Sequence, residues 1–350
     1  MPEDRIVDVV PRGPATGVKL RSRFSARTRS PRVLYVYSVD ASFVRTDLAI
    51  LSSISKVEPV QFRGKSSYPA IARGILRADI VVCWFALGFA LFSSVVGGIM
   101  GRRSVVISGG WDVEAIPEIG YGLLQTRWGR VRARAALTAA DVVLAFSEYS
   151  AGLIRSVAPK AKVKTGPLGV DTESFRPGKK DGSVVTIAHI NRENLDRKGL
   201  RSFVLAARNI PNVRAIVVGK QLDDAVDELR RISGPNVSFP GWLPNDELQA
   251  VLAKASVYAQ PSYTEGFGLA IAEAMASGCV PVVTRAGAIP ELVGDTGIYV
   301  RYGDIRELSN AIQRAIDSPV GPLARERVKT FFSLNRRSDL LKRTVNELER

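Results

Sequence analysis

The chain has few of the residues that metal centres and disulfide frameworks need. Its 350 residues include one histidine, His189, and two cysteines, Cys83 and Cys279. One histidine cannot support a histidine-based metal centre. Both cysteines lie among apolar residues, which predicts reduced, buried thiols in a cytoplasmic protein. The chain also contains no Asp-x-Asp motif, and we therefore expect an activity without a bound metal.

Acidic residues are scarce in the first half of the chain. The net charge is +15 at pH 7; residues 1–180 carry 27 Lys and Arg against 14 Asp and Glu, whereas residues 181–350 carry 22 against 20. A basic half beside a nearly neutral half indicates an anionic partner on one side only. A phospholipid surface, a lipid-phosphate acceptor and a nucleic acid all carry that charge. A peripheral position on the inner face of the membrane would suit the first two.

One long run of the sequence carries no charge. Residues 80–101 form an uncharged stretch of 22 residues, long enough for a membrane span. Residues 80–84 are β-branched and strand-like, however, and another apolar run follows at 104–108. The pattern favours a strand, a buried helix and a strand over a span. Residues 1–30 lack the apolar core of a signal peptide and are rich in Arg and Ser, so we expect a disordered basic leader there.

Short apolar runs alternate with helical segments from residue 32 onward, which indicates βαβ units and a mostly parallel sheet. A segment rich in Gly and Pro interrupts this alternation and reads as a linker. We therefore expect an α/β protein with two doubly wound, Rossmann-like domains facing across a cleft, where ligands of open sheets bind. The predicted divisions are the leader 1–30, a first domain 31–165, the linker 166–182, a second domain 183–320, and C-terminal helices 321–350 that could pack back on the first domain.

The most informative block is PSYTEGFGLAIAEAMASGCVPVV, which begins at residue 261. Glu265 precedes a Gly-rich turn, and Glu273 follows after seven residues in an Ala-rich helical segment. A strand, a tight loop and a helix in this order bring unpaired backbone N–H groups and the positive end of a helix to one point, which attracts phosphate. Carboxylates accept hydrogen bonds from vicinal diols. Together these groups suit a nucleotide sugar. The alternative is that Glu265 only favours the helix N-terminus and that Glu273 is an ordinary solvated helix residue.

This block resembles the E-x7-E motif of glycosyltransferase family 4, whose members are retaining enzymes of the GT-B fold. The resemblance implies that Glu265 contacts the donor sugar and that Glu273 holds the ribose hydroxyls. The backbone amides that would face the diphosphate or the sugar belong to Gly266, Phe267, Gly268 and Leu269.

Two cations follow the expected first strand of the second domain. Arg192 and Lys198 lie six residues apart in a loop ahead of a helix. Fixed positive charge there would stabilise a departing diphosphate, and the resemblance places both residues on the donor phosphates. Arg197 is an alternative to Arg192 in the neighbouring register. A solvated run of charges is the other interpretation.

Two further loops of the second domain resemble donor-binding loops of the family. Trp242 lies in a loop that the resemblance places near the base, where it would either stack on the base or pack in the core. Gly287 and Glu291 match a G-x-x-x-E loop close to the donor. Glu291 could contact the donor or only brace the loop.

The first domain is expected to hold the acceptor. Asp112 follows an apolar strand and a Gly-Gly turn, at a place near the donor sugar where many relatives carry a histidine. We expect Asp112 to take that place, although turn formation is an alternative role for it. Further on, Arg127, Arg130 and Arg134 share one helix face, which would be either solvated or apposed to an anionic membrane.

The sequence therefore predicts a retaining, metal-independent hexosyltransferase that uses no cofactor. It would move a sugar from a UDP- or GDP-sugar to a hydroxyl group of a glycan or lipid-linked glycan; the resemblance alone supplies the word retaining. One alternative keeps the fold but changes the reaction to that of a nucleotide-sugar epimerase or a phosphorylase. The other is a basic nucleic-acid-binding protein. We find no nucleic-acid-binding module in the sequence, and so expect no specific nucleic acid partner.

Overall fold

The computed structural model describes residues 30–349. The basic leader expected over residues 1–30 lies outside this range except for its last residue, so the expectations about it stay predictions.

The first sheet contains six parallel strands in the order β2-β1-β3-β4-β5-β6. Its central strands are buried on both faces because helices cover both sides, which explains why they read as continuous apolar runs. The strands are β1 (Arg32–Tyr37), β2 (Lys56–Gln61), β3 (Ile80–Trp84), β4 (Arg103–Ser108), β5 (Val142–Ala145) and β6 (Val163–Thr165). The helices between them are α1 (Ser42–Ile54), α2 (Tyr68–Arg77), α3 (Gly88–Ile99), α4 (Arg127–Ala139) and α5 (Glu148–Val157).

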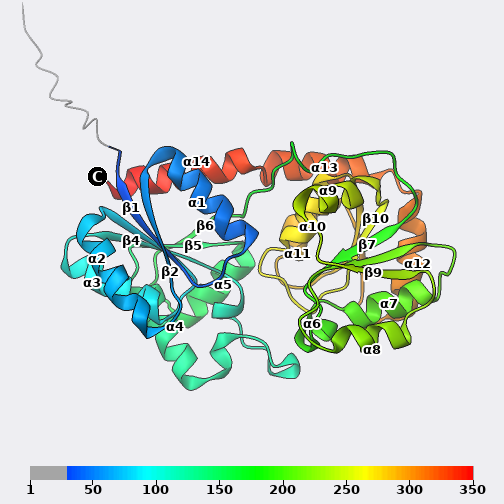
Figure 1. Ribbon diagram of the computed structural model, residues 1–350, viewed down its shortest axis with the longest axis horizontal. Helices are drawn as coiled ribbons and strands as arrows, with labels where there is room; N and C mark the ends of the chain where they lie inside the picture. The colour runs from blue at the N-terminus through cyan, green and yellow to red at the C-terminus, as the bar shows by residue number, and fades with distance from the viewer. Residues whose placement is uncertain (1–29, 350) are drawn as a thin grey trace, which may run out of the picture. The chain divides into compact units, whose positions relative to one another are not determined.

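The second sheet repeats this plan with six parallel strands in the order β12-β11-β10-β7-β8-β9. Its strands are β7 (Val184–Ile187), β8 (Ala215–Val218), β9 (Val237–Gly241), β10 (Val257–Gln260), β11 (Val280–Thr284) and β12 (Ile298–Val300). The accompanying helices are α6 (Arg192–Arg197), α7 (Leu200–Arg208), α8 (Ala225–Ile232), α9 (Asn245–Lys254), α10 (Leu269–Ala276), α11 (Ile289–Val293) and α12 (Ile305–Ile316). The expected pair of doubly wound, parallel α/β sheets is therefore confirmed (Figure 1).

The uncharged run over residues 80–101 is divided between β3 and α3, and both elements contribute to the core of the first sheet. Among the helices of residues 30–349, none has the length and apolar character that crossing a bilayer demands.

Two helices complete the chain, α13 (Val320–Phe331) and α14 (Leu334–Leu348). α13 packs on α10 of the second sheet, and α14 packs on α1 of the first. Arg337 of α14 is 1% exposed and forms a bidentate ion pair with the buried carboxylate of Asp47 in α1. The Arg337 guanidinium also donates to the carbonyl oxygen of Gly166 at 2.8 Å. The end of the chain is thus fixed to the first sheet.

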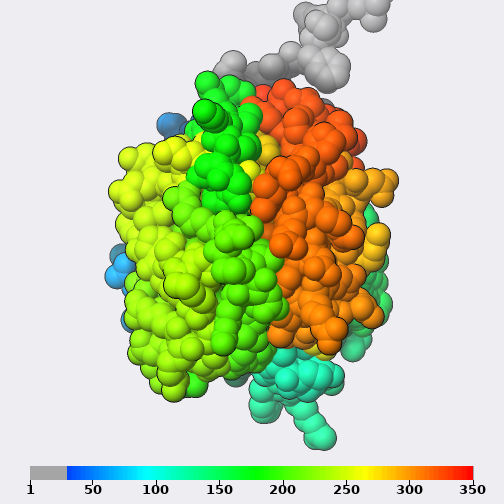
Figure 2. Space-filling model, turned by 90° about the vertical axis from the view of Figure 1, so that its right-hand side faces the viewer, coloured from blue at the N-terminus to red at the C-terminus, as the bar shows by residue number. Residues whose placement is uncertain are grey.

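The segment 166–182 contains no helix or strand and runs beside α13 (Figure 2). The guanidinium of Arg325 in α13 donates to the carbonyl oxygens of Phe175 at 2.7 Å and Thr172 at 3.0 Å. Lys180 donates to the carbonyl oxygens of Ala255 at 2.8 Å and Ser277 at 2.7 Å, just after α9 and α10. The segment is therefore held along the second sheet's helices.

Candidate functional site

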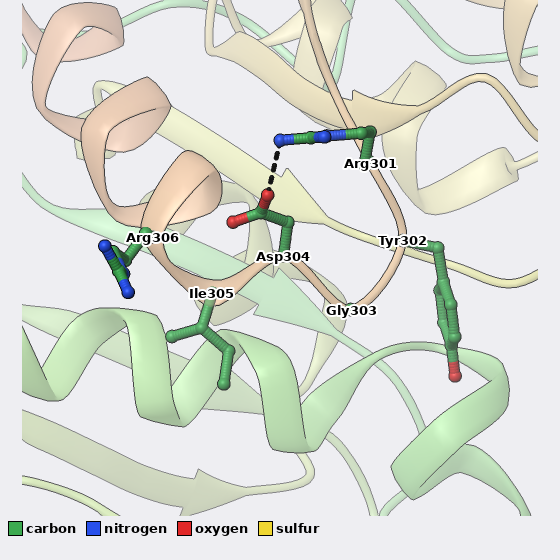
Figure 3. Close-up of a pocket in the computed structure, with 6 residues that line it drawn as sticks. All are labelled: Arg301, Tyr302, Gly303, Asp304, Ile305 and Arg306. Carbon is green, nitrogen blue, oxygen red and sulfur yellow. Dashed lines mark hydrogen bonds and ion pairs between the residues drawn. The ribbon is translucent and has the colours of Figure 1, made fainter.

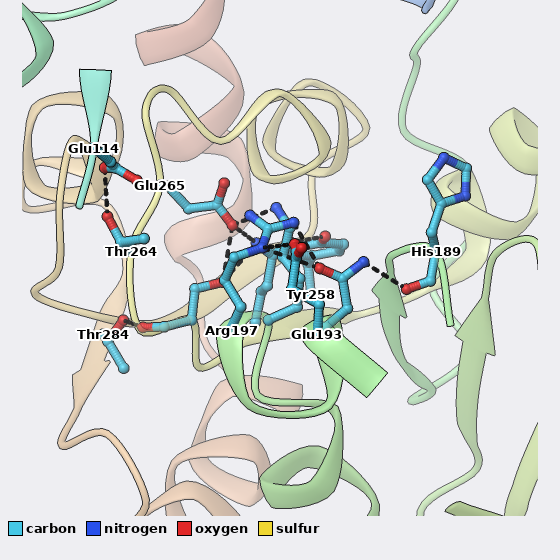
Figure 4. Close-up of polar contacts among 12 residues, drawn as sticks. Glu114, His189, Glu193, Arg197, Tyr258, Thr264, Glu265 and Thr284 are labelled. Carbon is cyan, nitrogen blue, oxygen red and sulfur yellow. Dashed lines mark hydrogen bonds and ion pairs between the residues drawn. The ribbon is translucent and has the colours of Figure 1, made fainter. Parts of the chain in front are cut away.

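The loops that follow β7 and β10 meet at Glu265, which lies beyond the carboxyl ends of the strands of the second sheet (Figure 4). This is the edge at which open parallel sheets bind their ligands. Glu265 is 6% exposed. Its Oε1 atom accepts hydrogen bonds from Lys198 Nζ at 2.5 Å, from Ser262 Oγ at 2.9 Å, and from the Gln260 amide.

The charge of Glu265 is stabilised by its neighbours. Burial by itself opposes the ionised form, but the attraction of Lys198 and then of Arg197, together with the hydrogen bonds, lowers the pKa of Glu265 below its usual value. No residue within 30–349 donates a hydrogen bond to the second oxygen, Oε2. A fixed carboxylate with one unused oxygen is therefore available to a ligand hydroxyl.

Lys198 reaches Glu265 because of a tight turn after α6. Gly199 has φ = +69°, and a Cβ atom there would lie 2.3 Å from the carbonyl oxygen of Pro261. Only glycine permits so close an approach in this conformation. Burial lowers the pKa of Lys198, while the Glu265 carboxylate acts in the opposite direction. The two side chains form a largely buried ion pair at the centre of the site.

Arg192 and Arg197, both on α6, point to different surroundings. Arg192 is exposed and pairs with Asp224 at 2.6 Å, while its backbone N–H is bound by Asp223. The guanidinium of Arg197 instead lies 4.6 Å from the centre of the Tyr121 ring, which belongs to the first half of the chain. Arg197 also lowers the pKa of Glu265. The structure thus brings Lys198 and Arg197 to the site, and gives Arg192 other partners.

The Gly-rich loop supplies unpaired backbone donors. α10 begins after Gly268, whose φ is +91°, and it has no side-chain cap and no acidic residue in its first turn. Over the described part of the chain, no group accepts a hydrogen bond from the N–H groups of residues 266–269. These unpaired amides indicate an anion-binding site at the N-terminus of α10, as the sequence predicts.

Glu273 lies one turn into α10, and its side-chain carboxyl group has no hydrogen-bond partner among the described residues, although its backbone carbonyl accepts from Ser277 Oγ. Solvent still reaches part of this side chain, yet the surrounding protein raises its pKa to about 8, with burial as the cause. A partly buried carboxyl group without a hydrogen-bond donor is costly unless a ligand supplies one.

The other donor-side residues lie around this centre. Trp242 is 65% exposed in the loop between β9 and α9, so its ring is free to stack on a ligand. Gly287 has φ = +56°, and a Cβ atom there would lie 2.4 Å from the carbonyl oxygen of Glu265. The Glu291 carboxylate accepts from the backbone N–H groups of Glu148 at 2.7 Å and Tyr149 at 2.6 Å, both in α5. Of these three residues, Trp242 alone presents a free side chain.

Asp112 is fully buried in the first half of the chain. Its Oδ2 atom accepts from the Ala86 N–H at 2.8 Å and from Ser108 Oγ at 2.7 Å, and its Oδ1 atom accepts from the N–H groups of Gly109 and Gly110. Through these contacts Asp112 holds the turn after β4 together, as its alternative role requires. Its expected place near the donor sugar stays a prediction.

Sequence reasoning missed Glu114, which lies close to Glu265 (Figure 4). Its Oε1 atom accepts from Thr264 Oγ1 at 2.9 Å and from the Tyr149 hydroxyl at 3.3 Å. Burial, partly offset by these hydrogen bonds, raises the pKa of Glu114 to about 7. The signal was faint, since Glu114 is only one more acidic residue in the loop after β4.

A surface hollow lined by residues 301–306 lies at the start of α12 (Figure 3). Its acidic residue, Asp304, caps α12 and pairs with Arg301 at 2.7 Å. Arg301 and the acidic residue of that hollow are therefore engaged with each other, and we place the candidate site at Glu265 instead.

Comparison with known proteins finds a family match over the second sheet. The family model described as glycosyl transferases group 1 matches residues 183–318, which include every strand of the second sheet. The chain is 29% identical to an MMP alpha-(1->4)-mannosyltransferase from Mycolicibacterium hassiacum over 71% of the chain and 62% of the relative. It is 28% identical to a GDP-mannose-dependent alpha-(1-6)-phosphatidylinositol monomannoside mannosyltransferase from Mycolicibacterium smegmatis, over 69% of the chain and 68% of the relative. The chain spans less than two thirds of the length of the first curated relatives that it matches.

Solved structures share the arrangement of both sheets. Sucrose-phosphate synthase from Thermosynechococcus elongatus superposes with a TM-score of 0.73 at 18% identity, covering 91% of this chain and 99% of that one. HepE from Anabaena, in complex with UDP and glucose, gives a TM-score of 0.73 at 19% identity, covering 91% and 100%. These likenesses concern the fold. With the family match over residues 183–318, they show a GT-B fold whose second half matches the group 1 glycosyltransferases.

Proposed function

We propose that this protein transfers a hexosyl group from a nucleotide diphosphate sugar to an acceptor hydroxyl group. The observation that carries the proposal is the fixed Glu265 carboxylate, which lies beside Lys198. The unpaired amides of residues 266–269 follow it in sequence, and the unpartnered carboxyl group of Glu273 lies in the helix that those amides precede. Glu265 suits a sugar hydroxyl, Lys198 and the amides suit a leaving diphosphate, and Glu273 suits a ribose diol. In this proposal, residues 183–320 bind the donor and residues 31–165 bind the acceptor.

Sugar transfer requires the site to stabilise the negative charge that develops on the leaving phosphate. The bond between the anomeric carbon and the phosphate oxygen breaks, and a bond to the acceptor oxygen forms on the same face of the sugar. The proton of the acceptor hydroxyl passes to the leaving phosphate. Lys198 and the amides before α10 would stabilise that phosphate, and Glu265 would orient the sugar through Oε2.

The proposal assigns the second cationic role to Arg197 in preference to Arg192. The charge of Arg197 lowers the pKa of both Glu265 and Lys198, whereas Arg192 forms an ion pair with Asp224 at an exposed position. Retention of configuration and independence from metal are further parts of the proposal, and the first rests on the family resemblance. Trp242 would stack on the base of a UDP- or GDP-sugar.

A glycan or lipid-linked acceptor is proposed from the relatives and from charge. One relative is named for action on a phosphatidylinositol mannoside. In this chain, α4 exposes Trp128 (73%) and Val131 (59%) among the exposed arginines of residues 127–134. Such a face suits a peripheral contact with an anionic membrane on its cytoplasmic side, since each Lys or Arg near that surface contributes about 1 kcal/mol. Vesicles with and without anionic lipid would test this contact.

The first experiment is a thermal-shift screen of the protein against nucleotide sugars and free nucleotides, without added metal and then with EDTA. A donor at 100 times its dissociation constant stabilises a protein by about 2.7 kcal/mol. We expect one nucleotide diphosphate and its sugar to shift the transition in the presence of EDTA. A shift only with oligonucleotides, or only when metal is present, would contradict the proposal. Incubating the selected donor with candidate acceptors and determining the anomeric configuration of the product by NMR would then test transfer and retention.

A further inference from the structure

The carboxylate of Glu291 joins the two halves of the chain. α5 begins at Glu148, and the N–H groups of its first residues have no partner within the helix. Ser147 Oγ accepts from the Ser150 N–H at 3.0 Å. The Glu291 carboxylate accepts from the N–H groups of Glu148 and Tyr149 at 2.7 and 2.6 Å. A residue separated from α5 by more than 130 positions thus completes the cap of that helix.

Glu291 is itself held from both ends of α11. The Arg327 guanidinium, on α13, donates to the carbonyl oxygens of Leu292 at 2.7 Å and Glu291 at 2.8 Å. At the other end, the Ala288 N–H donates to the carbonyl oxygen of Glu265 at 2.8 Å. α11 therefore connects the backbone of Glu265 to the N-terminus of α5.

A second contact joins α5 to the same loop. The carbonyl oxygen of Gly266 accepts from Ser147 Oγ at 2.9 Å and from Ser150 Oγ at 3.2 Å. A Cβ atom at Gly266 would lie 2.2 Å from the carbonyl oxygen of Gly109, so the loop lies directly against the first half of the chain. The start of α5 thus reaches the loop around Glu265 both directly and through Glu291.

We propose that Glu291 is a positioning residue that docks α5 on α11, and so sets the acceptor-side half of the protein against the loop that carries Glu265. Both of its carboxylate oxygens are engaged by backbone N–H groups. These two charge-assisted bonds account for the position of the Glu291 carboxylate without any contact to a donor. The effect on sugar transfer rests on the proposed function, whereas the docking itself does not.

The test compares full-length Glu291→Gln with Glu326→Gln as a matched control. Glu326 lies on α13 and forms an exposed pair with Lys329, so its loss leaves the contact between α5 and α11 intact. Glutamine at 291 keeps the size of the side chain but loses the charge and one acceptor oxygen. We expect the backbone amides at the start of α5 to exchange hydrogen about tenfold faster or more in Glu291→Gln, and to be unchanged in Glu326→Gln.

Two functional measurements distinguish positioning from donor binding. The thermal shift produced by the nucleotide should be the same in Glu291→Gln and in the wild type. The transfer rate at saturating donor should fall about tenfold, with the donor KM nearly unchanged. Loss of the nucleotide shift in Glu291→Gln would overturn the proposal in favour of a donor ligand, and so would unchanged exchange at the start of α5. If no nucleotide binds even the wild type, the proposed function fails, and hydrogen exchange alone then decides whether Glu291 docks α5.

Discussion

Replacing Lys198 by methionine tests the centre of the proposed site. The substitution keeps most of the buried stem but removes the ammonium group that lies 2.5 Å from Glu265 Oε1. Removing one partner of a buried ion pair typically costs about 3–5 kcal/mol, because the other charge is left uncompensated. The Lys198 side chain is 18% exposed, and Ser262 and Gln260 still donate to Oε1. We therefore expect a loss at or just below the lower limit of that range, about 2–3 kcal/mol in the free energy of unfolding.

The same substitution should affect turnover more than donor affinity. If Lys198 stabilises charge that develops only on the leaving phosphate, its loss should lower kcat about 10²- to 10³-fold. The donor KM should change far less, because the amides before α10 and Glu273 would still bind the donor.

Urea denaturation and steady-state kinetics measure both effects, and two variants serve as controls. Lys329→Met breaks the exposed pair with Glu326 and should cost less than about 1 kcal/mol. The double variant Lys198→Met/Glu265→Gln should recover much of the lost stability, because no uncompensated charge remains. The reasoning fails if the double variant is no more stable than Lys198→Met, or if Lys198→Met unfolds at the same urea concentration as the wild type.

Three further outcomes are expected. The pKa of Glu273 is raised to about 8, so the free protein should lose stability as the pH rises from about 4.5 to above 8. Urea titrations of Glu273→Gln should no longer show this part of the pH dependence. The same variant should bind the donor more weakly in the thermal-shift screen. Trp242→Ala should raise the donor KM about two- to tenfold, since an aromatic contact contributes about 0.5–1.5 kcal/mol. The melting temperature should stay constant because the side chain is exposed. Arg337→Met should destabilise the protein by about 3–5 kcal/mol by leaving the Asp47 carboxylate buried and unpaired; a loss as large in Arg337→Met/Asp47→Asn would contradict this cause.

The fold could be predicted because its signals are local. Runs such as residues 80–84 and 280–283 are apolar throughout, as strands covered on both faces must be, and both are buried along their length. The E-x7-E block likewise combines a loop and a helix that are contiguous in sequence, so the unpaired amides before α10 follow from short-range rules.

The remainder of the site depends on contacts between residues whose sequence spacing shows no periodic pattern. Arg192 and Arg197 are equally basic, and the orientation of the short helix α6 decides which of them lies against Tyr121. Glu114 meets Thr264 across 150 positions of sequence. The buried carboxylate of Asp112 accepts hydrogen bonds from three backbone N–H groups and one hydroxyl group, and no spacing in the sequence predicts these contacts.

The pairing of Asp47 with Arg337 has a consequence for the order in which the protein forms during synthesis. The two residues are 290 positions apart, so every strand of both sheets is translated before the arginine. Until then, α1 carries a carboxylate that has no guanidinium to meet it, and burying such a charge alone is unfavourable. We therefore expect the nascent first half to keep α1 loosely attached on the ribosome. The final packing of α1 should come only when α14 has emerged, long after all six strands of the first sheet are available.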